Sequence, residues 1–264
     1  MKLTCQLYDG TIVELPVGND LTKVSINKTE AVSVDLSPLS SLSQLKSLNL
    51  AKNKLKLVDF SQIGAHPNLE QVSVSYNPLT SIDLQPLANC VNLKILRMTG
   101  CSLSEINLEP LKDLKQLEQL SISFNNITVL NLSPLASCES LEILTINRNH
   151  LEDINLEPLS FCSKLKTLNI GDNPLQSVDL EPLASCSNLY SIVLNKTRIS
   201  SIDLKPLEKL GNLSGLDLSL NQLDVVDLRP LQHCNLTEIK LFGNPIREIV
   251  QPDDYNTSII LEDL

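Results

Sequence analysis

The sequence repeats itself every 24 residues, and this period constrains the fold more than any other feature. One column of the repeat is the proline of a Pro-Leu pair, which only Gln62 interrupts: Pro38, Pro86, Pro110, Pro134, Pro158, Pro182, Pro206 and Pro230. No insertion shifts the phase between residues 21 and 230. A fixed period of about 20 to 50 residues indicates a repeat protein, in which each unit packs only on its neighbours.

Three apolar columns keep the same phase. They begin at Leu21, Val24 and Ile26, and in the unit from Leu117 they are Leu117, Leu120 and Ile122. The last two columns alternate with polar residues, so this segment is a predicted strand with alternate side chains facing inward. Stacked units would place these strands side by side in a parallel sheet.

Three residues after the strand, most units carry asparagine. The whole motif reads L-x-x-L-x-L-x-x-N, with Cys or Thr replacing Asn in some units. An asparagine amide both donates and accepts, so it can satisfy backbone groups of two adjacent units. We therefore predict a structural ladder of Asn53, Asn77, Cys101, Asn125, Asn149, Asn173, Thr197 and Asn221.

This motif resembles the leucine-rich repeat (LRR) family over residues 21–250, in about ten units. The resemblance implies a right-handed horseshoe solenoid, with the parallel β-sheet on its concave face. The proline that follows each "IDL"-like segment favours short turns or 3-10 segments on the convex face. We expect an N-terminal cap at residues 1–20, with a hairpin at Asp9-Gly10, and a C-terminal cap at residues 251–264.

A cysteine column follows the Pro-Leu pairs and alternates with leucine. Cys138, Cys162 and Cys186 occupy consecutive units, so neighbours in a sheet would be close enough for a disulfide or a metal site. The same column accepts Leu114 and Leu210, however, as expected of a tight apolar position. We predict buried free thiols, and no metal or other cofactor.

A second polar column is Asp or Asn in all nine units in phase: Asp35, Asp59, Asp83, Asn107, Asn131, Asn155, Asp179, Asp203 and Asp227. Short polar side chains commonly bond to backbone N–H groups at turns. Stacked carboxylates could instead bind calcium, but the three central members are uncharged Asn. The pattern favours a structural role in the turn.

Composition and motifs argue against several functions. The formal net charge of −10 disfavours nucleic acid and anionic membranes as partners. No apolar run reaches the ~18 residues of a membrane helix, and the first residues alternate polar and apolar instead of forming a signal peptide. We therefore expect a cytoplasmic protein without membrane insertion. Phosphate-loop, hydrolase and metalloprotease motifs are absent, so we predict no enzyme activity.

The predicted function is a noncatalytic scaffold that binds a protein through the concave face. Strand positions facing away from the core are mostly small and polar, so we single out the aromatic, Arg and aliphatic exceptions as partner-binding residues: Tyr76, Ile95, Arg97, Phe124, Ile143, Arg148 and Val193. The alternative for the aromatic column is packing against the adjacent loop. Similar short cytoplasmic LRR proteins regulate phosphatases or small GTPases. The alternative function is an extracellular or surface recognition domain.

Overall fold

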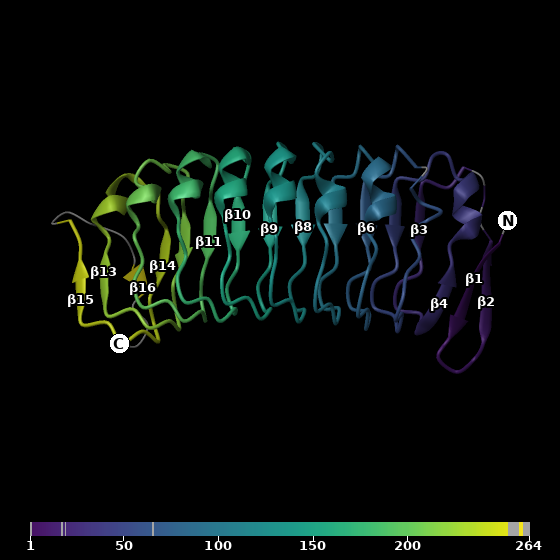
Figure 1. Cartoon of the computed structure of the whole chain (residues 1–264), viewed down its shortest axis with the longest axis horizontal. Helices are drawn as coiled ribbons and strands as arrows, with labels where there is room; N and C mark the ends of the chain where they lie inside the picture. The colour runs from purple at the N-terminus through teal and green to yellow at the C-terminus, as the bar shows by residue number, and fades with distance from the viewer. Residues whose placement is uncertain (1, 17, 19, 65, 253–258, 261–264) are drawn as a thin grey trace.

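The leucine-rich segment of each unit forms a short strand, and these strands stack along the length of the molecule in the computed structural model (Figure 1). The structure describes residues 2–16, 18, 20–64, 66–252 and 259–260. The stacked strands are β3 (Lys23–Ser25), β5 (Ser47–Asn49), β6 (Gln71–Ser73), β7 (Ile95–Arg97), β8 (Gln119–Ser121), β9 (Ile143–Thr145), β10 (Thr167–Asn169), β11 (Ser191–Val193), β12 (Gly215–Asp217), β14 (Glu238–Lys240) and β16 (Ile259–Ile260).

Within the described ranges these strands form one 11-stranded sheet, ordered β16-β14-β12-β11-β10-β9-β8-β7-β6-β5-β3. The pairing is parallel, and its register is one whole repeat. Leu144 of β9 pairs with Leu120 of β8 on one side and with Leu168 of β10 on the other. Equivalent residues of successive units therefore lie beside each other across the sheet.

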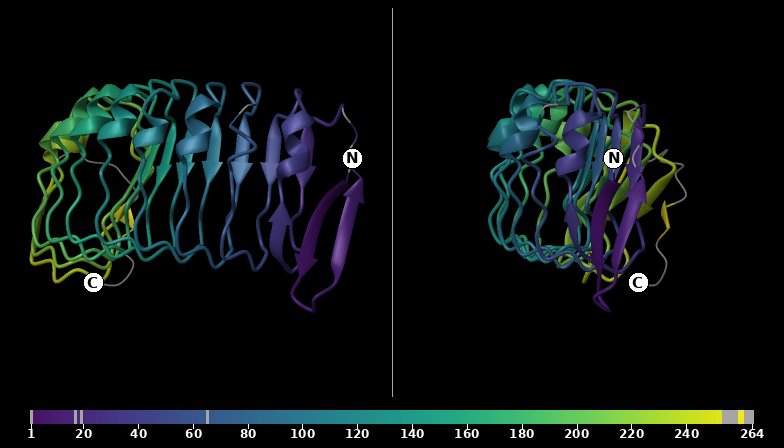
Figure 2. Two further views of the ribbon diagram at one scale, coloured as in Figure 1. Left: turned by 45° about the vertical axis from the view of Figure 1, so that its right-hand side comes forward. Right: turned by 90° about the vertical axis from the view of Figure 1, so that its right-hand side faces the viewer.

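The opposite side of the solenoid carries one-turn 3-10 helices (Figure 2). They are η1 (Ser37–Ser41), η2 (Gln85–Asn89), η3 (Glu109–Leu111), η4 (Ser133–Ser137), η5 (Glu157–Phe161), η6 (Glu181–Ser185), η7 (Lys205–Leu207) and η8 (Arg229–His233). Each has its proline in the first two positions, where no N–H is needed. The unit containing Gln62 forms only a hydrogen-bonded turn there. The predicted leucine-rich repeat solenoid is confirmed.

The Asp/Asn column stabilises the turn that leads into each of these 3-10 segments. In all nine units its Oδ1 accepts the N–H two residues later, at distances between 2.8 and 3.0 Å, as from Ser37 to Asp35 and from Ser133 to Asn131. The backbone hydrogen bond from Ser37 lowers the pKa of Asp35 below its ordinary value. The column has the geometry of an Asx turn and faces solvent at Asp35.

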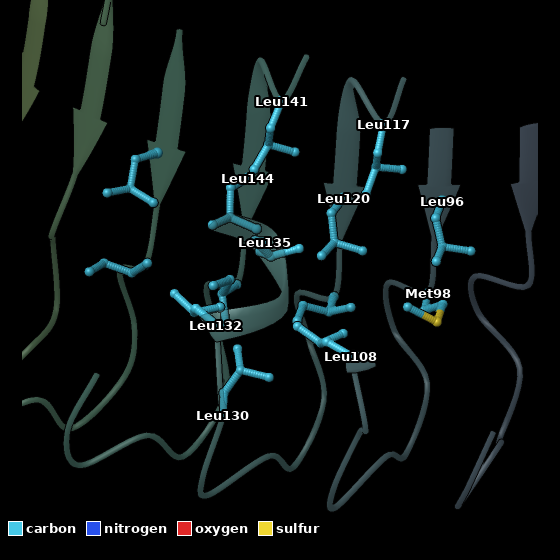
Figure 3. Close-up of a cluster of buried hydrophobic side chains, with 14 of the residues drawn as sticks. Leu96, Met98, Leu108, Leu117, Leu120, Leu130, Leu132, Leu135, Leu141 and Leu144 are labelled. Atoms are coloured by element: carbon cyan, nitrogen blue, oxygen red, sulfur yellow. The ribbon is translucent and has the colours of Figure 1, made fainter. Parts of the chain in front are cut away.

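The core is a set of stacked leucine rows. Leu96, Leu120 and Leu144 occupy adjacent strands and point into the interior, and each is fully buried (Figure 3). A buried leucine contributes about 2 kcal/mol by removing apolar surface from water. Because the rows run through every unit, the core is continuous from one end of the solenoid to the other.

Each end of the solenoid carries additional strands. β1 (Lys2–Leu7) and β2 (Ile12–Pro16) form an antiparallel hairpin around Gly10, whose φ of 87° is in the left-handed region. β1 also pairs with β4 (Ala31–Asp35). At the other end β13 (Val225–Asp227) pairs with β15 (Glu248–Val250), and β16 pairs with β14. Much of the C-terminal cap expected at 251–264 lies outside the described residues.

The ladder asparagines bond to backbone on both sides. Asn125 is typical, because its Nδ2 donates to the carbonyls of Met98 (2.9 Å) and Ile122 (3.0 Å). Its Oδ1 accepts the N–H of Leu103 at 3.2 Å. One buried amide therefore ties a strand end to two points of the preceding unit.

Where cysteine or threonine replaces asparagine, the neighbouring backbone rearranges. The Cys101 thiol donates to the Val74 carbonyl at 3.6 Å but offers no amide oxygen to the unit before it. The Leu79 N–H bonds instead to the carbonyl of Asn77 at 2.8 Å. The N–H of Leu175, one unit before Thr197, turns to the carbonyl of Asn173 in the same way.

We predict that Asn125→Leu lowers the free energy of unfolding by about 1–3 kcal/mol, because it leaves the Met98 carbonyl and the Leu103 N–H unpaired inside the protein. The Ile122 carbonyl keeps a second donor, the Asn149 amide. Asn126→Leu is the matched control, since this neighbour is exposed and should change stability by less than about 0.5 kcal/mol. Urea unfolding followed by circular dichroism measures both. Equal losses in the two variants would contradict a bonding role for Asn125.

The cysteine column donates weak hydrogen bonds inside the core. The thiols of Cys138, Cys162 and Cys186 lie 3.6, 3.4 and 3.3 Å from the carbonyls of Leu111, Leu135 and Leu159, each in the preceding unit. All seven cysteines are free. Burial raises the pKa of Cys138 to about 11 and that of Cys162 to about 12. These thiols stay protonated at neutral pH.

A thiol reagent such as Ellman's reagent should therefore distinguish the native from the unfolded chain. We expect Cys90, Cys101, Cys138, Cys162 and Cys186 to remain unmodified at about pH 8 in the native protein, because protonated and buried thiols are poor nucleophiles. In urea all seven should react. Rapid native labelling of Cys162, located by mass spectrometry, would show that the column is accessible.

His66 occupies the cysteine column in the unit that lacks the proline. Its side chain is 1% exposed, and its Nε2 has no hydrogen-bond partner among the described residues. Burial lowers the pKa of His66, although the carbonyls of Leu39 and Leu42 oppose this effect. The folded state therefore favours the neutral imidazole.

Stability should consequently fall as the pH drops below about 6.5, the ordinary pKa of histidine, because the unfolded chain then binds a proton that the folded chain does not. His66→Leu removes this dependence and fits a column that elsewhere holds leucine. Unfolding measured at about pH 7.5 and about pH 5.5 should show a larger loss in the wild type than in the variant. Parallel losses would disprove the titration of His66.

Candidate functional site

The sheet face is the surface formed by the outward side chains of β3 to β14. Ile95, Gln119 and Ile143 pair across three adjacent strands, so the two isoleucines flank Gln119. The Arg97 guanidinium donates to Gln119 Oε1 at 2.8 Å and so reaches over β8. Val193 lies farther along, beside Asp217. All four predicted residues, Ile95, Arg97, Ile143 and Val193, are partly exposed on this face.

The turn edge comprises the residues immediately before and after each ladder position, where the chain leaves the sheet. The residue before the ladder position has a positive φ, for example 59° at Phe124, 57° at Arg148 and 52° at Lys196. Gly100 and Gly243 occupy the same column with φ of 68° and 70°. The left-handed turn directs each side chain outward beside the sheet face.

The structure brings two of the predicted residues together on this edge. The Arg148 guanidinium carbon lies 4.5 Å from the centre of the Phe124 ring, a cation–π distance. Arg148 Nε also lies 3.1 Å from Asp172 Oδ2. These three residues come from consecutive units and form one continuous row.

Tyr76 lies apart from that row. Its ring occupies the space beside Gly100, where an added Cβ would come within 2.6 Å of the ring. Lys52 Nζ lies 5.7 Å from the centre of the same ring. The predicted surface therefore divides into a patch on the sheet face, the Phe124–Arg148 pair, and Tyr76 with its own neighbours.

Two hollows follow this division. A hollow of about 670 Å³ opens at the turn edge, and its wall includes Phe124, Arg148, His150, Asp172, Lys196, Arg198 and Leu220. A second hollow of about 420 Å³ lies on the sheet face near Tyr76, Arg97 and Gln119. The sequence analysis does not single out His150, Asp172, Lys196, Arg198 or Leu220, which also line the first hollow. These residues occupy the two columns immediately before and after the ladder position. The column before it also contains Phe124 and Arg148, so their position in the repeat could have identified them.

The charged residues are divided between two sides of the solenoid. The sheet face and turn edge carry more basic residues (Lys23, Lys28, Lys52, Lys54, Arg97, Arg148, Lys196, Arg198 and Lys240) than acidic ones (Glu30, Asp172, Asp217 and Glu238). The opposite side carries the Asp column and further acids such as Glu105, Glu109, Glu152 and Glu157. A chain with a net charge of −10 thus presents a locally basic surface.

Within the described residues, no group of three His, Cys, Asp or Glu side chains is placed to hold a metal ion. The same part of the chain contains no helix that is both apolar and long enough to cross a membrane. The arrangement at the turn edge instead combines an exposed ring, an exposed aliphatic side chain and several cations, which suits noncovalent recognition.

Comparison with protein families identifies the repeat. A leucine-rich repeat model matches residues 91–151 and 187–246, and a second leucine-rich repeat model matches residues 161–184. These models describe the repeat itself, and no catalytic family is identified. No curated protein matches the chain in sequence.

Solved structures share the fold. A leucine-rich repeat protein of Leptospira interrogans is similar with a TM-score of 0.76 and 23% identity, over 84% of this chain and 55% of that one. This chain therefore spans about half of that protein. Internalin C2 of Listeria monocytogenes matches with a TM-score of 0.62 and 28% identity, over 81% of this chain and 85% of the internalin.

A plant peptide hormone receptor, RGFR1, solved in complex with RGF2, matches with a TM-score of 0.70 and 24% identity, over 79% of this chain and 34% of the receptor. The repeat columns, the parallel sheet with 3-10 turns opposite, and the matches of both repeat models agree with one another. The chain belongs to the leucine-rich repeat family.

Proposed function

We propose that this chain is a noncatalytic scaffold that binds a protein partner through the sheet face and the adjoining turn edge. The observation that carries the proposal is the exposure of Ile95, Ile143 and Val193 on the sheet face and of Phe124 on the adjoining turn edge, all held by the stacked repeats. Large side chains on a rigid framework lose little entropy on binding, and aromatic and Arg residues are enriched in interface hot spots.

The cytoplasm is the proposed location, and the free cysteines support it. A buried column of unpaired thiols suits a reducing compartment, whereas secreted proteins usually pair their cysteines. A phosphatase or a small GTPase is the proposed class of partner, on the basis of the family resemblance alone. Neither proposal changes which surface is expected to bind.

Recognition outside the cell is the second candidate function. It is favoured by the similarity to RGFR1, which was solved with RGF2, and by the similarity to an internalin. Both candidates use a noncatalytic binding surface, so the same surface variants test them.

The test compares two triple variants with the same chemistry. Ile95→Asp/Ile143→Asp/Val193→Asp alters the sheet face, and Leu57→Asp/Val129→Asp/Phe161→Asp alters exposed residues of other faces, with exposed fractions of 69%, 79% and 62%. A partner is captured on the immobilised wild-type chain, identified, purified, and titrated against each protein. Circular dichroism verifies that both variants fold.

We expect the sheet-face variant to bind the purified partner at least about tenfold more weakly, because buried carboxylates would replace apolar contacts. The control variant should stay within about twofold of wild type. The opposite ranking, or equal affinity of all three proteins, would show that the sheet face is not the binding surface.

A further inference from the structure

The hollow at the turn edge contains two cations without partners. Lys196 and Arg198 are exposed and lie on either side of the buried ladder residue Thr197. Neither forms an ion pair with any residue that the structure describes, whereas Arg148 in the same hollow is paired with Asp172. Both cations therefore remain available to a carboxylate from outside the chain.

Apolar side chains stand on both sides of these cations. Phe124 is 42% exposed and Leu220 is 39% exposed, and both line the hollow. They belong to the same column as Lys196, respectively three units before it and one unit after it. A ligand that spans the hollow would meet an apolar contact, then positive charge, then a second apolar contact.

The backbone at this column does not itself require such side chains. Phe124, Lys196 and Leu220 have φ of 59°, 52° and 59°, where an L side chain is disfavoured by roughly 1–2 kcal/mol. Gly100 and Gly243 adopt the same conformation without a side chain. Lys28, Lys52, Tyr76, Arg148 and Asp172 also have a positive φ at this column, so the left-handed turn belongs to the repeat as a whole. The residue type at this column is therefore set by the outer surface and not by the turn.

From this geometry we infer that the hollow binds an extended acidic segment of a protein, with apolar residues on both sides of its acids. Carboxylates of the segment pair with Lys196 and Arg198, and its apolar side chains pack on Phe124 and Leu220. The inference rests on the proposed function, since it names the chemistry of a partner for the same surface. The basic character of this surface in an acidic protein steers an acidic segment toward it.

The spacing of the units sets the length of the segment. Phe124 and Leu220 are four units apart, which at about 4.8 Å per strand is about 19 Å. An extended peptide rises about 3.3 Å per residue and shows alternate side chains to one face. A peptide of about seven residues spans the same distance. Lys196 and Arg198 are three units from Phe124, about 14 Å, so the fifth and sixth residues of that peptide lie opposite them.

A peptide suits the hollow better than a nucleic acid. A single strand carries a negatively charged phosphate on every nucleotide, whereas Asp172 lies in the row between Arg148 and Lys196. Repulsion from this carboxylate disfavours a continuous run of negative charge. A peptide can place its acids at Lys196 and Arg198 and a neutral residue beside Asp172.

The probe is a fluorescein-labelled peptide of seven residues, with Leu at the first and seventh positions, Glu at the fifth and sixth, and Ser elsewhere. Fluorescence polarisation measures its binding to the full chain. A second peptide has Gln in place of Glu, and an oligo-uridine RNA of about seven nucleotides tests the nucleic acid alternative.

Two protein variants carry the same charge change within one repeat unit. Lys196→Glu/Arg198→Glu alters the hollow, and Lys205→Glu/Lys209→Glu alters exposed lysines of the opposite side. We expect the Glu peptide to bind the hollow variant at least about tenfold more weakly than wild type, and the control variant within about twofold. The Gln peptide should bind wild type about tenfold more weakly than the Glu peptide does. Added salt should weaken the binding of the Glu peptide to wild type.

Binding of the RNA with the same dependence on Lys196 and Arg198, and no binding of the Glu peptide, would overturn the inference in favour of a nucleic acid. Equal affinity of both protein variants for the Glu peptide would overturn it as well, as would no binding at about 1 mM peptide. If binding of the captured partner depends on Ile95, Ile143 and Val193 but not on Lys196 and Arg198, the proposed function stands and this inference fails.

Discussion

The structure depends on how each unit satisfies the backbone at the point where the chain turns out of the sheet. A three-residue strand followed by a left-handed turn leaves buried N–H and C=O groups that its own unit cannot pair. The ladder asparagine pairs them across two units, as Asn125 does with Met98, Ile122 and Leu103. This bond fixes the register of the units, and the register stacks the leucine rows and aligns the outer columns.

The binding surface follows from that register. Equivalent residues of successive units lie side by side, so each column of the repeat forms a row on the surface. Where the residue type differs between units, the chemistry of the surface changes along that row. Phe124, Arg148, Asp172, Lys196 and Leu220 form such a row. The same repetition places the Asp column on the opposite side, where it closes the turns and concentrates negative charge. One repeat therefore separates the charges of the chain between two sides.

Much of the fold could be predicted from the sequence, because each structural role recurs in a fixed column. The parallel strands, the turns at the prolines and the Asx role of the aspartates all have a local residue signature. The hollow at the turn edge could not be predicted, because its residues differ from unit to unit and its shape depends on side-chain directions. Phe124 and Arg148 can be recognised by residue type, whereas Lys196 and Leu220 have no signature that separates them from the Lys, Asp and Gly residues elsewhere in the same column.

The cysteine column shows that the position of a residue in the repeat indicates its role better than its residue type does. Cys162 alone could suggest a disulfide or a metal, but its column also holds Leu114 and Leu210, and its thiol donates to a backbone carbonyl. In the unit that contains Gln62, this column holds His66, and the same unit lacks both the proline and the 3-10 helix. Departures from the repeat thus occur together, because neighbouring columns share one packing environment.

The most direct test of this account is hydroxyl-radical footprinting of the chain, free and bound to its captured partner, with mass spectrometry of the modified side chains. Ile143, Phe124 and Leu220 should lose reactivity in the complex, while the exposed Val129 and Phe161 should react equally in both states. Protection of Val129 and Phe161, with Ile143, Phe124 and Leu220 unchanged, would contradict binding through the sheet face and turn edge.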